Sequence, residues 1–283
     1  MTWSERLGEV GVWRGYQMVD ASLARTIEAL GYGAIWQGSS PPADLRAAEE
    51  LLDATESLVV ATGVVNIWMA DPDELAASFH RIEAKHPGRL LLGIGSGHRE
   101  ATPERVRPLD AMARYLDVLD AHEVPPQSRL ISALGPKMLA MAQERSAGTH
   151  PYLSIPSQTR EQRDALGPDA LIAPEQTVVL ETDPDEGRAA GRAFLATYLG
   201  MVNYTSTMQR GGFTEQDVAD GGSDRLIDAI VPHGSAAELA GHVRAHLDAG
   251  ADHVCVQVQP ARSDVVATLT ALAAELGLSS TTA

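Results

Sequence analysis

Residues 58–75 read LVVATGVVNIWMADPDEL, and this stretch decides the fold. Its first part, from Leu58 to Val65, is an apolar run rich in β-branched residues, which is typical of a parallel strand covered on both faces. Asp71 and Pro72 then give a helix-start signal, an N-cap followed by proline in the first turn. A strand followed closely by a helix predicts an α/β protein. Asn66 should lie at the carboxyl end of the strand, where such folds bind ligands.

The alternation of short apolar runs and helical patterns continues along the chain. Strands are predicted over residues 10–13, 33–37, 58–65, 89–97, 129–134, 150–154, 175–182 and 252–258. Helices are predicted over residues 19–30, 44–56, 108–122 and 136–145, and between Asp71 and Gly88. Eight βα units in a chain of this length predict a single TIM (β/α)8 barrel over residues 1–283. About 70 residues separate the seventh strand from the eighth, and we interpret residues 203–235 as a substrate-lid insertion over the mouth of the barrel. A surface spacer is the alternative interpretation.

Composition limits the partners and the compartment. The formal net charge is -16 at pH 7, which disfavours nucleic-acid and anionic membrane surfaces because phosphate binding needs clustered basic residues. The single cysteine, Cys255, excludes an intramolecular disulfide and a multi-cysteine metal site. The chain start shows no apolar segment of signal-peptide length. We therefore predict a soluble, cytoplasmic protein without a metal site, a nucleic-acid partner or a membrane partner.

The end of the fourth predicted strand carries glycines but no dinucleotide fingerprint. The sequence GIGSGH, residues 93–98, has histidine where G-x-G-x-x-G needs its third glycine. The motifs of serine hydrolases, P-loop nucleotidases and zinc proteases are also missing. Gly95, Ser96, Gly97 and His98 nevertheless leave the backbone open to the edge of a flat ring or a ribityl chain. A tight turn between strand and helix is the alternative.

A second signal lies in ALGPKM, residues 133–138. Gly135 and Pro136 stand where a strand becomes a helix, so the free N–H groups of Lys137 and Met138 should point out of the helix start. Such a terminus can cradle a phosphate. An ordinary helix start is the alternative.

Three histidines and several strand-end residues are further candidates. His98, His150 and His233 all fall near predicted loops, and its position after two glycines favours His98 as the catalytic group. Predicted substrate-pocket residues, several of them strand-end side chains that could instead plug the barrel, are Trp13, Gln37, Trp68 and Tyr204.

Taken together, several segments resemble the luciferase-like monooxygenase superfamily, and most closely the actinobacterial oxidoreductases that use the deazaflavin coenzyme F420. The segments that carry the resemblance are GYGAIWQGS, ATGVVNIWMADPDELAASFHRIEAKHPGRLLLGIGSGH, ALGPKMLAMAQERSAGTHPYL, LIAPEQTVVLETDP, YLGMVNYTS and DGGSDRLIDAIVPHGSAAELAGHVRAHLDAGADHVCVQV. They cover nearly the whole chain. The resemblance also favours a homodimer.

The resemblance implies roles for the candidate residues. Family members commonly have a non-prolyl cis peptide at the end of the third strand, which supports the flavin or deazaflavin ring, and here it would join Asn66 to Ile67. By the same resemblance, residues 95–98 lie beside the cofactor. The cofactor phosphate would bind at Ala133, Leu134, Gly135, Pro136 and Lys137.

The predicted activity is hydride transfer between F420 and a small organic substrate, with His98 as the proton-exchanging residue. One alternative is an FMN-dependent monooxygenase that uses dioxygen and reduced flavin. A second alternative is a non-catalytic flavin-binding barrel. The chain has QGSS after its second strand, residues 37–40, where better-known deazaflavin enzymes often have an acid or a histidine. No catalytic acid can therefore be carried over from the family.

Overall fold

The structure is a computed structural model that describes residues 2–97 and 107–279. The strands are β1 (Val10–Gly15), β2 (Ala34–Gly38), β3 (Val59–Thr62), β4 (Val65–Asn66), β5 (Leu90–Gly95), β6 (Arg129–Ile131), β7 (Gly148–Thr149), β8 (Leu171–Ile172), β9 (Glu175–Leu180), β10 (His233–Gly234) and β11 (Val254–Gln259). The α-helices are α1 (Trp3–Leu7), α2 (Ala21–Ala29), α3 (Arg46–Ala54), α4 (Pro72–Lys85), α5 (Pro108–Ala121), α6 (Pro136–Arg145), α7 (Pro156–Leu166), α8 (Pro184–Leu199), α9 (Val202–Arg210), α10 (Glu215–Val218), α11 (Asp224–Ile230), α12 (Ala236–Asp248) and α13 (Val265–Leu276). Within the described residues, no helix combines the length and the apolar character needed to cross a membrane.

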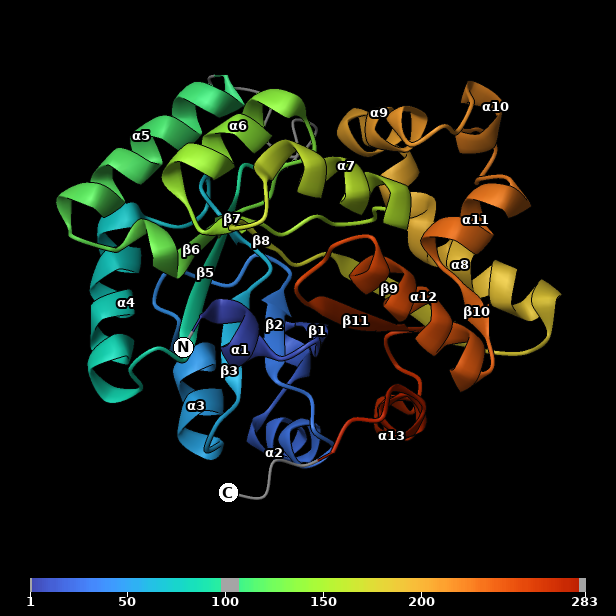
Figure 1. The fold of residues 1–283 in the computed structure, drawn as a ribbon, viewed down its shortest axis with the longest axis horizontal. Helices are drawn as coiled ribbons and strands as arrows, with labels where there is room; N and C mark the ends of the chain where they lie inside the picture. Colours follow the sequence, from blue (N-terminus) through green and yellow to red (C-terminus); the bar gives the residue numbers. More distant parts are fainter. Residues whose placement is uncertain (1, 98–106, 280–283) are drawn as a thin grey trace.

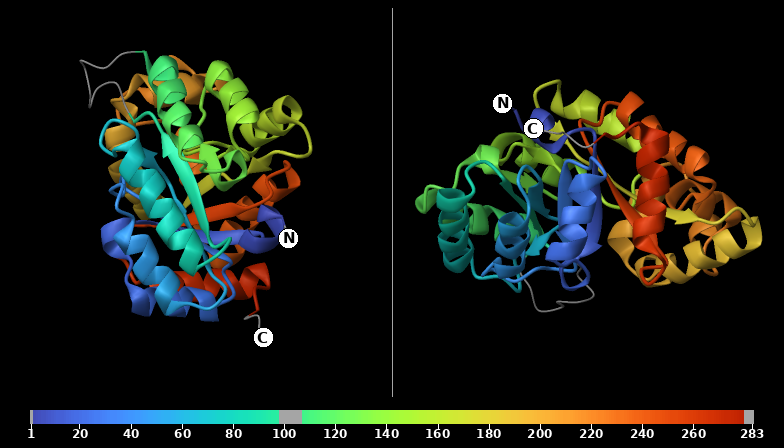
Figure 2. Two further views of the ribbon diagram at one scale, coloured as in Figure 1. Left: turned by 90° about the vertical axis from the view of Figure 1, so that its left-hand side faces the viewer. Right: turned by 90° about the horizontal axis from the view of Figure 1, so that it is seen from below.

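The strands form a closed parallel barrel. Strand β1 pairs with β2 on one side and with β11 on the other, and the order continues through β3, β5, β6 and β7 to β8. Strands β8 and β9 are separated only by Ala173 and Pro174, and β9 pairs with β11, so the two together close the ring. Figures 1 and 2 show the helices packed around the outside of the strands. The predicted TIM barrel is confirmed.

Alternating side chains divide the core into an outer and an inner cluster. Val12, Ile35 and Val60 belong to the cluster between the strands and the helices. Their neighbours Trp36 and Ala61 belong to the cluster that fills the barrel interior. This period of two explains why the strand runs contain so few polar residues, since both faces of each strand are buried.

The third barrel strand is interrupted, and the predicted position of its cis peptide was wrong. Strand β3 ends at Thr62, and the chain pairs again as β4 with β5. The non-prolyl cis peptide joins Gly63 to Val64 rather than Asn66 to Ile67. Gly63 fits this site because a Cβ there would lie 2.8 Å from Trp13 Nε1. The indole also donates a hydrogen bond to the Gly63 carbonyl over 3.0 Å.

Asn66 has a local role at the polar end of this strand. Its Oδ1 accepts the backbone N–H of Trp68 over 3.0 Å, and its carbonyl accepts the N–H of Met69 and that of Ala70. The amide therefore starts the turn that leads to α4. This explains why a buried strand ends on a polar residue.

The sixth predicted strand differs from the structure, and the predicted insertion, residues 203–235, is largely helical. The sixth barrel strand is Gly148–Thr149, so the range predicted for it, 150–154, lies just beyond the strand. Gly148 explains the shift. It has a φ of +153°, and a Cβ at this position would lie 1.9 Å from the Leu171 carbonyl oxygen, so only glycine fits here. Residues 203–235 form α9, α10, α11 and β10, and α11 packs on α8, where a Cβ at Gly191 would lie 2.7 Å from Ile227 Cγ2.

Replacing Asp71 with alanine should lower the free energy of unfolding by about 1 kcal/mol. The Asp71 carboxylate caps α4 by accepting the backbone N–H groups of Asp73 and Glu74 over 3.1 and 3.0 Å. Urea denaturation measures the change. Glu74→Ala is the control, since Glu74 contributes only its backbone to the cap. Equal stability of Asp71→Ala and the unaltered protein would show that the cap adds nothing.

Candidate functional site

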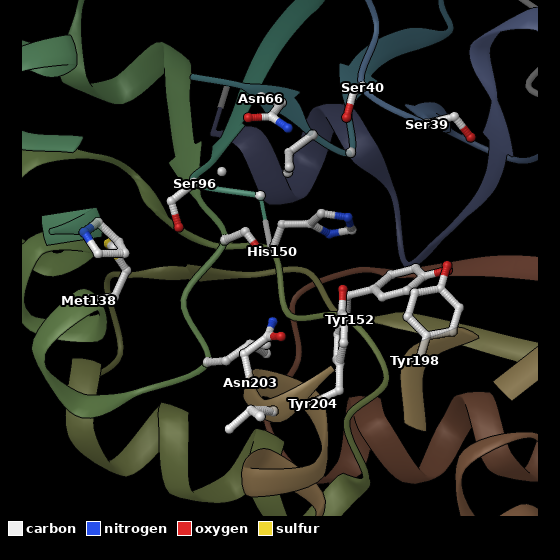
Figure 3. Close-up of a pocket in the computed structure, with 18 of the residues that line it drawn as sticks. Ser39, Ser40, Asn66, Ser96, Met138, His150, Tyr152, Tyr198, Asn203 and Tyr204 are labelled. Carbon is white, nitrogen blue, oxygen red and sulfur yellow. The ribbon is translucent and has the colours of Figure 1, made fainter. Parts of the chain in front are cut away.

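A cavity of about 930 Å³ opens at the carboxyl ends of the barrel strands (Figure 3). Its lining comes from β1, β4 and the end of β5, from the segments that follow β2, β3, β5, β6 and β7, and from α5, α6, α8 and α9. The lining residues are Trp13, Ser39, Ser40, Gly63, Val64, Asn66, Gly95, Ser96, Gly97, Pro108, Ser132, Leu134, Met138, His150, Tyr152, Tyr198, Val202, Asn203, Tyr204 and Ser206. This is the face on which TIM-barrel enzymes place their active sites.

One side of the cavity is formed by backbone with little side-chain cover. Gly95 and Gly97 follow β5 here, opposite Asn66 and Val64. A Cβ at Gly95 would lie 2.5 Å from Val64 Cγ2, and one at Gly97 would lie 2.7 Å from Asn66 Nδ2. Gly97 also has a φ of +56°, which disfavours other residues. A Cβ at either glycine would thus displace a side chain that lines the cavity, so this side keeps its shape only with glycine at both positions. We call this the glycine side.

Seven of the predicted site residues that the structure describes lie outside the cavity lining: Gln37, Ile67, Trp68, Ala133, Gly135, Pro136 and Lys137. Ile67 packs in the core, and Trp68 donates its indole N–H to the Ser96 carbonyl over 2.6 Å. Gln37 is fully buried beside Trp36, which faces the barrel interior, so strand alternation turns Gln37 towards the helices. Ser39 and Ser40 instead line the cavity after β2.

The start of α6 borders the cavity next to the glycine side. Leu134 and Met138 line it, whereas Ala133 is buried and Pro136 and Lys137 are exposed. Gly135 is the N-cap, and none of the side chains in the described part of the chain caps the helix. The amide groups of the first turn therefore have no intrahelical acceptor and no side-chain cap. Arg210 of α9 donates from Nη2 to the Leu134 carbonyl over 2.8 Å, which brings a guanidinium to this helix start.

His150 lies between the glycine side and the tyrosines, and Figure 3 shows its ring in the middle of the lining. It stacks on Trp36, with ring centroids 4.3 Å apart and an interplanar angle of 20°. Its Nδ1 lies 2.7 Å from the Ala173 carbonyl, so Nδ1 carries the proton and Nε2 is an acceptor. Burial lowers the pKa of His150 to about 4, against the opposing effect of that carbonyl. The ring is therefore neutral at pH 7.

The Nε2 atom of His150 is buried and has no hydrogen-bond partner among the residues that the structure describes. It faces Gly63, where a Cβ would lie 3.0 Å away. A buried acceptor without a donor lowers the free energy of unfolding by about 1–3 kcal/mol. Folded proteins rarely leave such a group unsatisfied, which makes His150 a candidate for ligand contact.

Figure 3 shows Tyr152, Tyr198 and Tyr204 across His150 from Ser96. Together with Trp13, which also lines the cavity, they form what we call the aromatic side. Trp13 and Tyr152 have ring centroids 5.5 Å apart, and Tyr198 and Tyr204 meet edge to face at 5.1 Å. Tyr152 donates its hydroxyl to Gln257 Oε1 over 2.9 Å and lies 3.0 Å from the Tyr198 hydroxyl. Because Tyr152 has one proton to give, Tyr198 is the donor of that second bond. Burial raises the pKa of Tyr152 and Tyr204, so both phenols stay protonated.

Glu175 supports the segment that carries His150 and Tyr152. Its backbone N–H donates to the Pro151 carbonyl over 2.9 Å, and its carboxyl accepts the N–H of Leu153 over 3.4 Å. Burial raises the pKa of Glu175 to about 8, against hydrogen bonds that act in the opposite direction. Glu175 is therefore mostly protonated at pH 7 and adds no full charge below the cavity.

Sequence reasoning missed several residues of this site. Trp13, Asn66 and Tyr204 were predicted and line the cavity, whereas Tyr152 and Tyr198 were not considered. His150 was considered but ranked below His98, which lies outside the described residues. The sequence around His150 does not reveal that its neighbours are Trp36 and the Ala173 carbonyl, because both belong to distant segments of the chain.

The described lining contains no aspartate, glutamate, lysine or arginine. Across residues 2–97 and 107–279, no group of three histidine, cysteine or acidic side chains is placed to hold a metal ion. The described part of the cavity thus offers neutral hydrogen-bonding groups, glycines and aromatic rings. Such a site is suited to binding and orienting a neutral flat ligand.

The chain resembles known proteins in part of its sequence and in its whole fold. Residues 20–124 match the family model described as luciferase-like monooxygenase, which confirms the predicted resemblance. No curated protein matches the chain at the sequence level.

Solved structures resemble the chain over nearly its whole length. An F420-dependent secondary alcohol dehydrogenase, in complex with an F420-acetone adduct, has a TM-score of 0.73 at 15% identity, covering 95% of this chain and 98% of its own. The coenzyme F420-dependent tetrahydromethanopterin reductase from Methanopyrus kandleri has a TM-score of 0.74 at 16% identity, with the same coverage. The oxygenating constituent of 3,6-diketocamphane monooxygenase from Pseudomonas putida, in complex with FMN, has a TM-score of 0.69 at 14% identity, covering 95% and 97%. At these identities the likeness shows the fold.

Proposed function

We propose that this chain is an oxidoreductase that transfers a hydride between the deazaflavin coenzyme F420 and a small organic substrate. The observation that carries the proposal is the cavity, which has an open glycine side for a flat ring and an aromatic side for a second ligand. When bound, the deazaflavin supplies the hydride chemistry, so the protein needs neither a metal nor a nucleophile. Two F420-dependent proteins with the same barrel support this assignment.

The residues present fit such a cofactor. Gly95 and Gly97 present no side chains of their own to the cavity and let Val64 and Asn66 pack against their main chain, and Asn66 and Ser96 line the same side. The uncapped start of α6 suits a phosphate, because its free amide groups and the helix dipole both favour an anion. Arg210 adds a positive charge next to it. We assign the ring to the glycine side and the phosphate to the segment from Ala133 to Lys137.

We also assign a covering role to the insertion. Asn203, Tyr204 and Ser206 of α9 line the cavity, whereas α11 packs on α8. The start of the predicted lid, residues 203–235, would therefore contact the substrate. The rest of the insertion would anchor this first part to the barrel. A cover that excludes water favours hydride transfer because it keeps solvent from the reacting atoms.

Replacing Gly135 with glutamate should weaken F420 binding at least tenfold, about 1.4 kcal/mol. Among the described residues, no heavy atom lies within 4 Å of a Cβ at Gly135, apart from its chain neighbours, so a Cβ at this position meets open space. Its carboxylate would repel an anion at the start of α6. Fluorescence titration with F420 measures the change. Gly135→Gln is the matched neutral control and should bind within about threefold of the unaltered protein. Equal affinity of the glutamate variant would place the phosphate elsewhere.

An FMN-dependent monooxygenase is the second candidate, because the diketocamphane monooxygenase component binds FMN on the same fold. The two candidates differ in their need for dioxygen. Hydride transfer with F420 proceeds without oxygen, whereas a monooxygenase consumes it. We expect substrate-dependent oxidation or reduction of F420, followed by absorbance, in an anaerobic cuvette. Turnover that requires both reduced FMN and dioxygen would overturn the F420 proposal, and a lack of turnover with either would leave the non-catalytic barrel.

A further inference from the structure

The acceptor on His150 limits what the cavity can bind next to it. Its Nδ1 proton is committed to the Ala173 carbonyl, and within residues 2–97 and 107–279 Nε2 has no partner. Stacking on Trp36 and near-complete burial hold the ring in this orientation. A ligand group that meets Nε2 must therefore be a donor, because another acceptor would leave two lone pairs opposed.

The aromatic side limits the body of the ligand. Trp13, Tyr152 and Tyr204 are each less than a tenth exposed, and Tyr198 is half-buried beside them. Aromatic rings favour other rings in offset or edge-to-face contact. The hydroxyl protons of Tyr152 and Tyr198 are engaged within the chain of bonds that ends on Gln257.

Charge gives the third limit. The described lining has no ionic side chain, and the nearby carboxyl of Glu175 is mostly protonated at pH 7. A carboxylate or an ammonium group moved from water into these surroundings would lose its hydration without gaining a counter-ion from the described lining.

We propose that the substrate is an uncharged ring compound that presents a hydrogen-bond donor, an O–H or N–H group, to Nε2 of His150, with its ring against the aromatic side. The inference rests on the proposed function for the use of this cavity and names the substrate class, a cyclic or aromatic alcohol or a compound with a neutral ring N–H. The ring N–H of the deazaflavin has the same donor chemistry. The test therefore separates these two sources.

The test uses three probes of similar size: benzyl alcohol, benzyl methyl ether and benzoate. Binding to the protein without cofactor is followed by the fluorescence of its tryptophans, since Trp13 lines the cavity. We expect benzyl alcohol to bind about fivefold more tightly than either of the other probes, as a single neutral hydrogen bond provides. In His150→Leu the alcohol and the ether should bind equally.

His246→Gln is the matched control. His246 is also a fully buried histidine, but both of its ring nitrogens have partners, Thr159 and Gln176, and it does not line the cavity. This variant should keep the preference for the alcohol. If His150→Leu does not fold, the comparison of the three probes on the unaltered protein decides the question.

Repeating the titrations with F420 identifies the donor. If the substrate hydroxyl is the donor, the alcohol preference persists in the F420-loaded protein and His150→Leu leaves F420 affinity unchanged. If the cofactor N–H is the donor, the preference disappears on loading and His150→Leu weakens F420 binding about fivefold. Both results support a donor at Nε2. Equal binding of alcohol and ether, with F420 affinity unchanged in His150→Leu, would overturn the inference, and so would tightest binding of benzoate.

The proposed function can fail separately. A protein that prefers benzyl alcohol but does not bind F420 would retain the inference about His150 and overturn the F420 assignment. A protein that binds F420 but does not distinguish the three probes would retain the F420 assignment and overturn the inference about His150.

Discussion

Replacing His98 with alanine should lower the turnover number by roughly 100-fold and leave the affinity for F420 nearly unchanged. His98 follows Gly97 in the sequence, and Gly95 and Gly97 line the cavity. General acid-base catalysis by a positioned side chain is typically worth this factor or more. Steady-state kinetics at saturating F420, together with a fluorescence titration, measure the two quantities.

His80→Ala is the control for this prediction. His80 lies on α4, and its Nε2 is 2.7 Å from the carbonyl of His122, away from the cavity. It should retain full turnover. A loss of F420 affinity with an intact chemical step in His98→Ala would instead mean that His98 only binds the cofactor. No change in either quantity would leave His98 without a role in the reaction.

The free energy of unfolding should be greatest near pH 6.5 and should fall by several kcal/mol towards pH 4.5. Burial lowers the pKa of three histidines, His150, His246 and His253, from 6.5 to about 4. Below pH 6.5 the unfolded chain binds protons that the folded chain excludes, so stability is lost as the pH falls.

Glu175 acts in the opposite direction. Its pKa is raised from 4.5 to about 8, so its contribution is fully present below pH 4.5 and is lost as the pH rises towards 8. Between pH 4.5 and 6.5 the three histidines outweigh this one carboxyl group. Between pH 6.5 and 8 Glu175 acts alone among these four, so the free energy of unfolding should decline again.

Urea denaturation at constant ionic strength, from pH 4.5 to 8.5, measures this profile. Glu175→Gln should remove the decline above pH 6.5, and His246→Gln should reduce the slope below it. An alkaline decline that is the same in Glu175→Gln would show that other groups cause it. An acid slope that is unchanged in His246→Gln would show that the buried histidines contribute little.

The barrel could be predicted because its signals are local. The run from Leu58 to Val65, the cap at Asp71 and the proline after it can all be read within one segment. The interruption at Gly63 could not be predicted in this way. It depends on Trp13, fifty residues earlier, whose indole donates to the Gly63 carbonyl. A glycine inside a strand pattern is itself a signal for close backbone approach, and it was the clue available.

The site was harder to predict than the fold, for the same reason. His150 becomes a candidate only when Trp36 stacks on it and the Ala173 carbonyl fixes its tautomer. Tyr198 reaches the cavity from the end of α8, and nothing in the helix pattern distinguishes it from a surface tyrosine. The glycines at the end of β5 were easier to predict as site residues. Alternating glycines at a strand end indicate a place where the backbone needs unusual freedom or close approach.

The assignment of F420 to this cavity is the central claim, and a fluorescence titration of the purified protein with F420 and with FMN tests it most directly. We predict saturable binding of F420, weakened at least tenfold in Gly135→Glu, and FMN binding at least tenfold weaker than that of F420. Tight binding of FMN with no saturable binding of F420 would contradict the account.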